Sequence, residues 1–481
     1  MVARRASTPP AGLIFCPHPD RGPKRKEELV SMPSATVPDG NVPQLRRALG
    51  LWDLILYGLI VIQPTAPMPV YGVMSMRAHG HAVTTVLIAM VAMLFTAISY
   101  GRMARIYPSA GSAFTYVGQE LHPGLGYITG WCMAMDYMLN PLISTILCAK
   151  FALNFLPGVP YAAWVLIFVV VFTFLNLHGI KTSARINTTL MVVMGVVIVI
   201  FLAAVARYVN LIPHGSAGFF TRPFYDPDTY STRAVLGGTS LAVLTYIGFD
   251  GISTLSEEVR NPRRNILLAT VLVCLITGAL ASIEVYAAQL VWPVSQPFPD
   301  VDTAFVFVAK RAAGQWLFSL INVTLLVATI GSGSGAQLGA ARLLYGMGRS
   351  NAIPRRFFGA IEPTRQIPRN NVLFIAVIAL IGALTVSFER GVELLNFGAL
   401  LAFMGVNAAA FFHYFVREGK RTVYNFFMPT AGFLICLLLW WSLSWHAKLL
   451  GVVWMVVGTA YGAYNTRGFK SELVNFEVPT N

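Results

Sequence analysis

The chain has 481 residues, of which 56% are hydrophobic and only 12% are charged. A soluble protein of this length needs roughly twice that share of charged residues to cover its surface, so a soluble globular protein is excluded. The net charge of +14 does not indicate a nucleic-acid partner, because most of the 35 Lys and Arg residues fall between apolar stretches on one predicted side.

Residues 1–44 are rich in Pro, Arg and Ser and show no apolar periodicity. A segment of this kind cannot bury enough apolar surface to fold, so we predict a disordered cytosolic tail there. Met32 is an alternative to Met1 as the start of translation. We expect residues 45–465 to form the membrane domain and residues 466–481 to form a short cytosolic tail.

The apolar residues of the membrane domain occur in blocks of about 20, the length that crosses the hydrocarbon core of a bilayer. These blocks predict an all-α polytopic membrane protein with twelve transmembrane helices. The predicted spans are 49–77, 80–103, 114–149, 160–178, 186–208, 234–258, 265–292, 313–347, 370–388, 391–416, 424–444 and 446–465. Basic residues concentrate on the side of the N-terminus, which predicts a multi-pass protein of the inner (plasma) membrane with both termini in the cytosol.

Two of the predicted spans contain residues that interrupt a helix. The first holds three prolines within residues 63–69 (Gln-Pro-Thr-Ala-Pro-Met-Pro), and the sixth holds Gly248 and Gly251 on either side of Asp250. Interrupted helices in corresponding positions of two halves are typical of a transporter with its substrate site near the bilayer midplane. We therefore predict that Gln63, Thr65 and Gly248 contact a substrate, the alternative being two unrelated packing kinks.

Three acidic residues, Asp136, Asp250 and Glu284, lie inside apolar spans, where no Lys or Arg occurs at a similar depth. An ionised side chain in hydrocarbon costs several kcal/mol unless it faces a cavity or a partner. These acids are predicted to line the site, where they attract a cationic ligand or carry protons. The alternative is that each is protonated or bonded to a hydroxyl group for structural reasons.

Other side chains near the interruptions have two interpretations each. Tyr246 and Phe249 flank the acid of the sixth span, where they either enclose a cation or pack on neighbouring helices. Ser332 lies in the small-residue segment 331–335 of the eighth span. Small residues favour close helix packing, and the Ser332 hydroxyl is a candidate ligand for a substrate or a sodium ion.

Enzymatic and metal-binding motifs are not found in the sequence. The five cysteines have no paired spacing, and no Ser-His-Asp set or phosphate-binding loop occurs outside the membrane spans. We therefore expect no catalytic residues, no metal and no cofactor, apart from H⁺ or Na⁺ as a coupling ion. The expected partners are a small amine or amino acid and the lipid bilayer, with no nucleic acid, and the oligomeric state is left open.

Four segments resemble signatures of the amino acid–polyamine–organocation superfamily, in the expected order. They are residues 95–101 with 107–116 (Phe-Thr-Ala-Ile-Ser-Tyr-Gly and Tyr-Pro-Ser-Ala-Gly-Ser-Ala-Phe-Thr-Tyr), residues 247–258, residues 342–349 and residues 396–403. Within the superfamily, residues 130–143 resemble the bacterial putrescine importers. The resemblance implies a LeuT-type 5+5 inverted repeat, with repeats at 49–208 and 234–416, broken helices 1 and 6, and two further helices at 424–465.

The sequence departs from the superfamily pattern at two places. Amino acid carriers have a Gly-Ser-Gly-like stretch at the first break, whose amides bind the substrate carboxylate, whereas this chain has Gln63 and prolines. Some proton-coupled relatives have a lysine in the fifth span where this chain has Met194. We therefore predict a permease that imports putrescine or a similar amine by alternating access, coupled to protons or another ion. An amino acid permease or an exchanger is the alternative.

Overall fold

The structure is a computed structural model that describes most of the membrane domain. The described residues are 49–108, 112–178, 184–212, 218–256, 258–349, 353–362, 365 and 367–465. The predicted tails at 1–44 and 466–481 lie outside the described residues.

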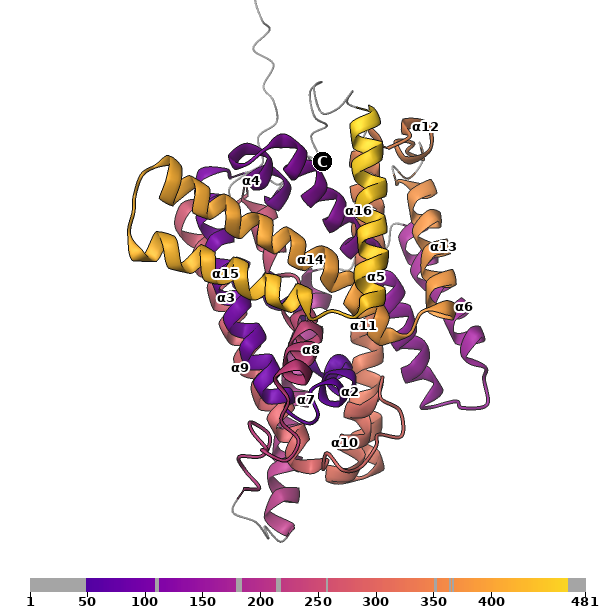
Figure 1. The fold of residues 1–481 in the computed structure, drawn as a ribbon. Helices are drawn as coiled ribbons and strands as arrows, with labels where there is room; N and C mark the ends of the chain where they lie inside the picture. The colour runs from indigo at the N-terminus through magenta and orange to yellow at the C-terminus, as the bar shows by residue number, and fades with distance from the viewer. Residues whose placement is uncertain are drawn as a thin grey trace, which may run out of the picture. The chain divides into compact units, whose positions relative to one another are not determined.

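Helices make up nearly all of the described chain (Figure 1). The first half contains α1 (Leu51–Ile62), α2 (Pro67–Arg77), α3 (Ala82–Ile106), α4 (Ser112–Glu120), α5 (Pro123–Leu153), α6 (Tyr161–Leu177) and α7 (Ala184–Leu211). The second half begins with α8 (Thr232–Ala242), the 3₁₀-helices η1 (Val243–Tyr246) and η2 (Phe249–Leu255), α9 (Pro262–Val291), α10 (Ala304–Ala313) and α11 (Gln315–Arg349). The remaining helices are α12 (Arg355–Phe358), α13 (Arg369–Thr385), α14 (Phe388–Phe411), the π-helix η3 (Phe412–Arg417), α15 (Val423–Trp441) and α16 (Trp445–Asn465).

Nine helices among the described residues are long and apolar enough to cross a membrane, or ten when the bent pair α1–α2 is taken as one span. The helices α6 and α13 are apolar but have only 17 residues each. Many apolar side chains on these helices point outward, including Val199 (66% exposed) and Val456 (60% exposed). Water does not stabilise such a surface but lipid does, which agrees with the predicted all-α membrane protein.

The structure differs from the predicted spans at two places. The span predicted at 114–149 consists of two helices, α4 and α5, because His122 is extended and its ring Nδ1 accepts the Gly124 N–H at 3.0 Å. Pro123 then occupies the first position of α5, where its missing N–H costs nothing. The connection between the predicted spans 265–292 and 313–347 contains α10, which packs against α2, α7, α9 and α11.

Two long helices, α5 and α9, form the frame around the cavity described below. The 31-residue α5 packs against α11 and α14, while α9 packs along α3 (Figure 1). The short α4 lies so close to α5 that a Cβ added to Gly126 would fall 2.6 Å from the Cα of Gly118. Glycine at both positions allows the two backbones to approach in this way.

Candidate functional site

The first span is interrupted between α1 and α2. Pro64 and Pro67 have no N–H group, so the ladder of α-helical hydrogen bonds cannot run through them. Gln63 has a backbone φ of +70°, which is uncommon for a residue with a Cβ, and the two helices are bent by 56°. Helical bonding resumes where the Met68 N–H donates to the Thr65 carbonyl at 3.0 Å.

The predicted sixth span is interrupted between η1 and η2. Gly248 has a φ of +122°, a conformation that residues with a Cβ rarely adopt, and its N–H donates to the Asp250 carboxylate at 3.3 Å. A Cβ on Gly248 falls 2.9 Å from Cγ1 of Val61 and 3.2 Å from Cγ1 of Ile62. The two interruptions therefore meet inside the protein, as expected for a shared site.

A cavity of about 380 Å³ begins where the interruptions meet. Its wall is built by α1, α5, α7, η2 and α11 together with the two interruptions. The lining residues are Tyr57, Ile60, Val61, Gln63, Pro64, Asp136, Tyr137, Asn140, Asn187, Leu190, Met191, Met194, Ile247, Gly248, Asp250, Gly251, Thr254, Ala328, Gly331, Ser332, Gly335, Ala336 and Gly339. Five of the predicted site residues belong to this set: Gln63, Asp136, Gly248, Asp250 and Ser332.

The charged groups of the cavity wall are two carboxyls. Asp136 comes from α5 and Asp250 from η2, and both residues are more than 90% buried within the protein. Within the described part of the chain, neither forms an ion pair, and the lining includes no Lys, Arg or His. Two acids that share a cavity without a cation favour a positively charged ligand.

The wall contributed by α11 combines a polar contact with close packing. Gln63 Nε2 donates to the Ala328 carbonyl at 3.1 Å, which ties the first interruption to this continuous helix. Ser332 lies one turn further and lines the cavity. Gly333 instead packs on α6, since a Cβ there falls 2.7 Å from the Phe172 ring. The small-residue segment therefore packs closely on α6 through Gly333, while Ser332 stays a candidate ligand on the cavity wall.

Two predicted aromatic residues lie away from the cavity. Tyr246 is fully buried, and its hydroxyl donates to the Val86 carbonyl of α3 at 2.9 Å. Phe249 packs edge-on against Tyr100, with ring centroids 5.6 Å apart, and also contacts Phe403. In this structure both side chains therefore pack on neighbouring helices, and neither lines the cavity.

Thr65 and Glu284 also lie outside the cavity lining. Thr65 is buried in the first interruption, where its carbonyl rather than its side chain makes the hydrogen bond to Met68. Glu284 is fully buried in α9, and neither of its carboxyl oxygens has a hydrogen-bond partner among the described residues. Glu284 is therefore placed as an isolated acid and not as part of the wall that holds Asp136 and Asp250.

The prediction missed five polar side chains of the wall: Tyr57, Tyr137, Asn140, Asn187 and Thr254. Tyr57 on α1 follows a detectable pattern, because positions 57, 60, 61 and 64 have the spacing of one helix face and all line the cavity. Tyr137 and Asn140 lie next to Asp136 on α5, whereas nothing in the sequence marks Asn187 on α7. Tyr57 and Tyr137 supply the aromatic surface that the prediction assigned to η1 and η2.

The cavity extends to one side of the interruptions only. Its lining follows α1 towards its first residues, α11 towards its last residues and η2 towards Thr254. On the other side, Gly72 of α2 packs so closely on the loop before α10 that a Cβ there falls 2.0 Å from the Val301 carbonyl. Tyr71 contacts Phe298 and Phe305 edge-on, with centroids 5.8 and 5.7 Å away. The cavity therefore lies on one side of the interruptions, and the contacts of Tyr71 and Gly72 on the other side border a separate pocket of about 780 Å³, whose lining includes Ser75, Phe298 and Val301.

A model of the family described as "Amino acid permease" matches residues 64–476. The chain belongs to this family. The permease is 33% identical over 451 residues to the low-affinity putrescine importer PlaP of Escherichia coli (strain K12), an alignment that covers 92% of this chain and 98% of the importer. It is 25% identical over 465 residues to the branched-chain amino acid permease BcaP of Bacillus subtilis (strain 168), covering 90% and 95%.

A eukaryotic relative is also similar over much of its length. The permease is 26% identical over 393 residues to the vacuolar cationic amino acid transporter 4 of Arabidopsis thaliana, which covers 76% of this chain and 62% of that protein. These matches confirm the resemblance inferred from the sequence. The protein is a polytopic membrane transporter and not an enzyme.

Proposed function

We propose that this permease imports a small amine, with putrescine or a related polyamine as the first candidate, across the cytoplasmic membrane by alternating access. The observation that carries the proposal is the pair of carboxyls, Asp136 and Asp250, in a cavity whose lining has no basic residue. A cation is the ligand whose charge this wall offsets. The relative PlaP, named a putrescine importer, supports the same class of substrate.

The backbone at the interruptions favours an amine over an amino acid. A substrate carboxylate needs free N–H donors, and Pro64 and Pro67 have none. The Gly248 N–H is already directed at the Asp250 carboxylate. Amino acid transport nevertheless stays the second candidate, because two of the relatives named above are a branched-chain and a cationic amino acid transporter.

The transport cycle follows from the one-sided cavity. We assign twelve spans by including α6 and α13, an inverted repeat of five plus five spans, and both termini to the cytosol. With that orientation the cavity lies on the cytosolic side, and the packing around Gly72 separates it from the pocket on the outer side. In the opposite state, α2 and η1 separate from their outer contacts and expose Asp136 and Asp250 to the outside.

Glu284 is our candidate for the residue that binds the coupling proton. A carboxyl that is fully buried without a partner is far more stable when protonated than when ionised. We therefore infer that Glu284 binds a proton whenever α9 is packed as in this structure. Sodium coupling is the alternative, in which the hydroxyl of Ser332 is a ligand.

The function is tested with the purified full chain in liposomes. Uptake of labelled putrescine, leucine and lysine is measured with a pH gradient, with a sodium gradient and with neither. We expect putrescine to accumulate and unlabelled putrescine to compete best. Accumulation of leucine that an excess of putrescine does not reduce contradicts the proposal in favour of an amino acid permease.

A further inference from the structure

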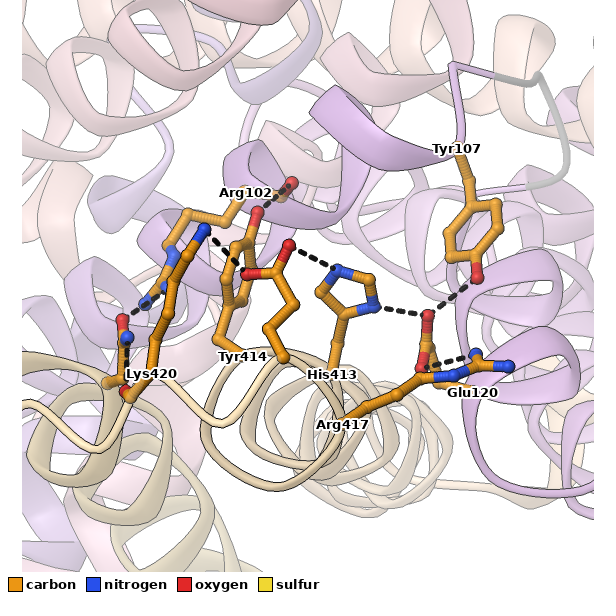
Figure 2. A network of polar contacts seen from close by, with 9 residues as sticks. Arg102, Tyr107, Glu120, His413, Tyr414, Arg417 and Lys420 are labelled. Atoms are coloured by element: carbon orange, nitrogen blue, oxygen red, sulfur yellow. Dashed lines mark hydrogen bonds and ion pairs between the residues drawn. The ribbon is translucent and has the colours of Figure 1, made fainter.

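A second group of charged side chains lies at the C-terminal end of α14, away from the cavity lining. Figure 2 shows His413 directed at Glu120, which also receives Tyr107 and Arg417. The Glu120 side chain is only 1% exposed and accepts from Tyr107 Oη at 2.6 Å, His413 Nδ1 at 2.6 Å and Arg417 Nη1 at 3.3 Å. Three donors hold this buried carboxylate between α4 and η3.

The second ring nitrogen of His413 faces another carboxylate. His413 Nε2 lies 3.6 Å from Oε1 of Glu418, which pairs with Lys420 at 3.0 Å. The hydrogen bond from Lys420 lowers the pKa of Glu418, so this carboxylate stays charged at physiological pH. Burial and the hydrogen bond to Glu120 raise the pKa of Tyr107 to about 12, so Tyr107 stays a neutral donor.

The charge of His413 decides how many of these contacts form. Neutral imidazole has one N–H, which serves Glu120, and its other nitrogen then turns a lone pair towards the Glu418 carboxylate. Protonated imidazole donates to both carboxylates. Histidine is the side chain that changes its charge between pH 5 and 8. Protonation of His413 turns its hydrogen bond to Glu120, which joins η3 to α4, into an ion pair, and adds a bond to Glu418 at the end of η3 itself.

The other ionisable groups around His413 are engaged elsewhere. Tyr414 donates to the Arg102 carbonyl at 3.1 Å, and the Arg102 guanidinium lies 3.7 Å from the centre of the Tyr414 ring and 5.0 Å from that of Tyr424. Arg102 also donates to Asn425 of α15 at 2.6 Å. Among the described residues, the ionisable side chains of this network are Arg102, Tyr107, Glu120, Tyr414, Arg417, Glu418, Lys420 and Tyr424.

The short helix α4 connects this network to the cavity. At its last residue, Glu120 binds His413, and at its first residue, Ser112 Oγ lies 2.7 Å from Ser253 Oγ of η2. Ser253 Oγ in turn donates to the Asp250 carbonyl at 2.6 Å. A displacement of α4 therefore acts on the 3₁₀ segment that carries a cavity carboxyl.

We propose that His413 is a pH-sensitive switch that regulates transport, with α4 as the lever between its ring and the η2 segment. Protonated His413 bridges Glu120 and Glu418 and favours the conformation described here, with the cavity open on this side. Neutral His413 keeps a hydrogen bond to Glu120 but loses the ion pair with it, so α4 is held less strongly, and α4 and η2 move towards the other conformation at lower cost. The regulatory role rests on the proposed function, but the conformational change is measurable without transport.

The direct test measures access to the cavity in the full-length permease. Ala336→Cys places a thiol on the cavity wall, and its labelling by a membrane-impermeant maleimide is compared in backgrounds with His413 and with His413→Gln. Glutamine keeps a donor for Glu120 but cannot gain a charge. Because thiol chemistry itself varies with pH, the readout is the ratio of the two labelling rates. We expect this ratio to rise about three- to fivefold from pH 8 to pH 6, the size expected for one partly exposed ion pair.

Three further variants decide where the effect originates. His178→Gln is the matched control, since His178 is exposed at the end of α6 and, among the described residues, hydrogen-bonds only to Phe174 of its own helix. It leaves the pH response unchanged. Ser112→Ala removes the contact with Ser253 and abolishes the response while His413 remains. In the double variant, His413→Gln adds nothing to Ser112→Ala, whereas additive effects contradict the lever.

Transport measurements separate this inference from the proposed function. In liposomes with the pH of the cytosolic side clamped, amine exchange by the wild type changes with pH, and exchange by His413→Gln does not. Absence of amine transport in the wild type sinks the proposed function, while the labelling ratio still tests the switch. A labelling ratio that is flat from pH 8 to pH 6, in a wild type that transports amine, overturns the switch.

Discussion

Replacing Asp250 by asparagine tests the electrostatic basis of the site most directly. Asparagine has the same shape, and its Oδ1 still accepts the Gly248 N–H, so the interruption between η1 and η2 is kept. The variant removes one of the two carboxyls that line the cavity and leaves Asp136 in place. Its effect on amine binding therefore measures charge and not folding.

The size of the effect follows from the surroundings of the carboxyl. An ammonium group about 4 Å from a carboxylate gains about 4 kcal/mol at the effective dielectric constant of about 20 found in proteins. Removing one partner of a buried charge pair costs about 2–5 kcal/mol. Because Asp136 still attracts the amine, we take the lower part, about 2–3 kcal/mol, which is a rise of about 30- to 150-fold in KM.

The assay is initial uptake of labelled putrescine into liposomes, with Asp53→Asn as the control. Asp53 is an exposed acid at the start of α1 that lines neither pocket, and asparagine still accepts the Gly50 N–H, so its replacement changes the net charge equally without touching the cavity. We expect the control to keep the wild-type KM. A folded Asp250→Asn protein with a KM within twofold of the wild type refutes the argument that the two carboxyls bind the amine.

Three other variants test separate parts of the structure. Glu284→Gln keeps the shape of the buried side chain without an ionisable group, so exchange of labelled for unlabelled amine continues while accumulation driven by a pH gradient is lost. Gly248→Ala places a Cβ 2.9 Å from Val61 at a φ of +122° and lowers the free energy of unfolding by about 1–3 kcal/mol, seen as a lower Tm. Gly195→Ala is the control inside α7, where a Cβ meets open space and alanine is the better helix former, so Tm does not fall. Burial raises the pKa of Asp302, against the opposing effect of Lys150. The folded-state pKa of Asp302 therefore exceeds its unfolded-state pKa, so protonated Asp302 stabilises the fold at acid pH, and this stabilisation is lost as the pH rises. Asp302→Asn raises Tm at pH 7, and the difference from the wild type shrinks towards pH 4.

The two interruptions were predictable because the residues that cause them act locally. Prolines in the first span remove donors wherever they occur in a helix, and Gly248 permits a φ that other residues avoid. The acids Asp136 and Asp250 were predictable for a related reason, since an ionisable residue in hydrocarbon must face a cavity or a partner. Neither inference needs knowledge of how the helices pack.

The aromatic wall was not predictable in the same way, because it depends on which side of a helix meets its neighbours. Tyr246 and Phe249 are adjacent in sequence to the interruption, but the 3₁₀ turns direct them at α3 and α14. Tyr57 was detectable from the spacing of α1, whereas Asn187 enters the wall only through the packing of α7. The break between α4 and α5 was missed although residues 118–124 (Gly-Gln-Glu-Leu-His-Pro-Gly) mark it, because the predicted span was continued through this polar segment.

The two cavity acids lie on backbones of different stiffness, and this difference bears on how a ligand drives transport. Asp136 belongs to α5, a continuous helix of 31 residues, whereas Asp250 belongs to the seven-residue 3₁₀ segment η2. Hydrogen bonds in a 3₁₀-helix are poorer in geometry, so η2 costs less to displace than α5. A ligand shifts a conformational equilibrium only by its difference in affinity for the two states. An amine that binds Asp136 alone shifts nothing, while an amine that bridges Asp136 and Asp250 favours the state in which the two carboxyls match its length.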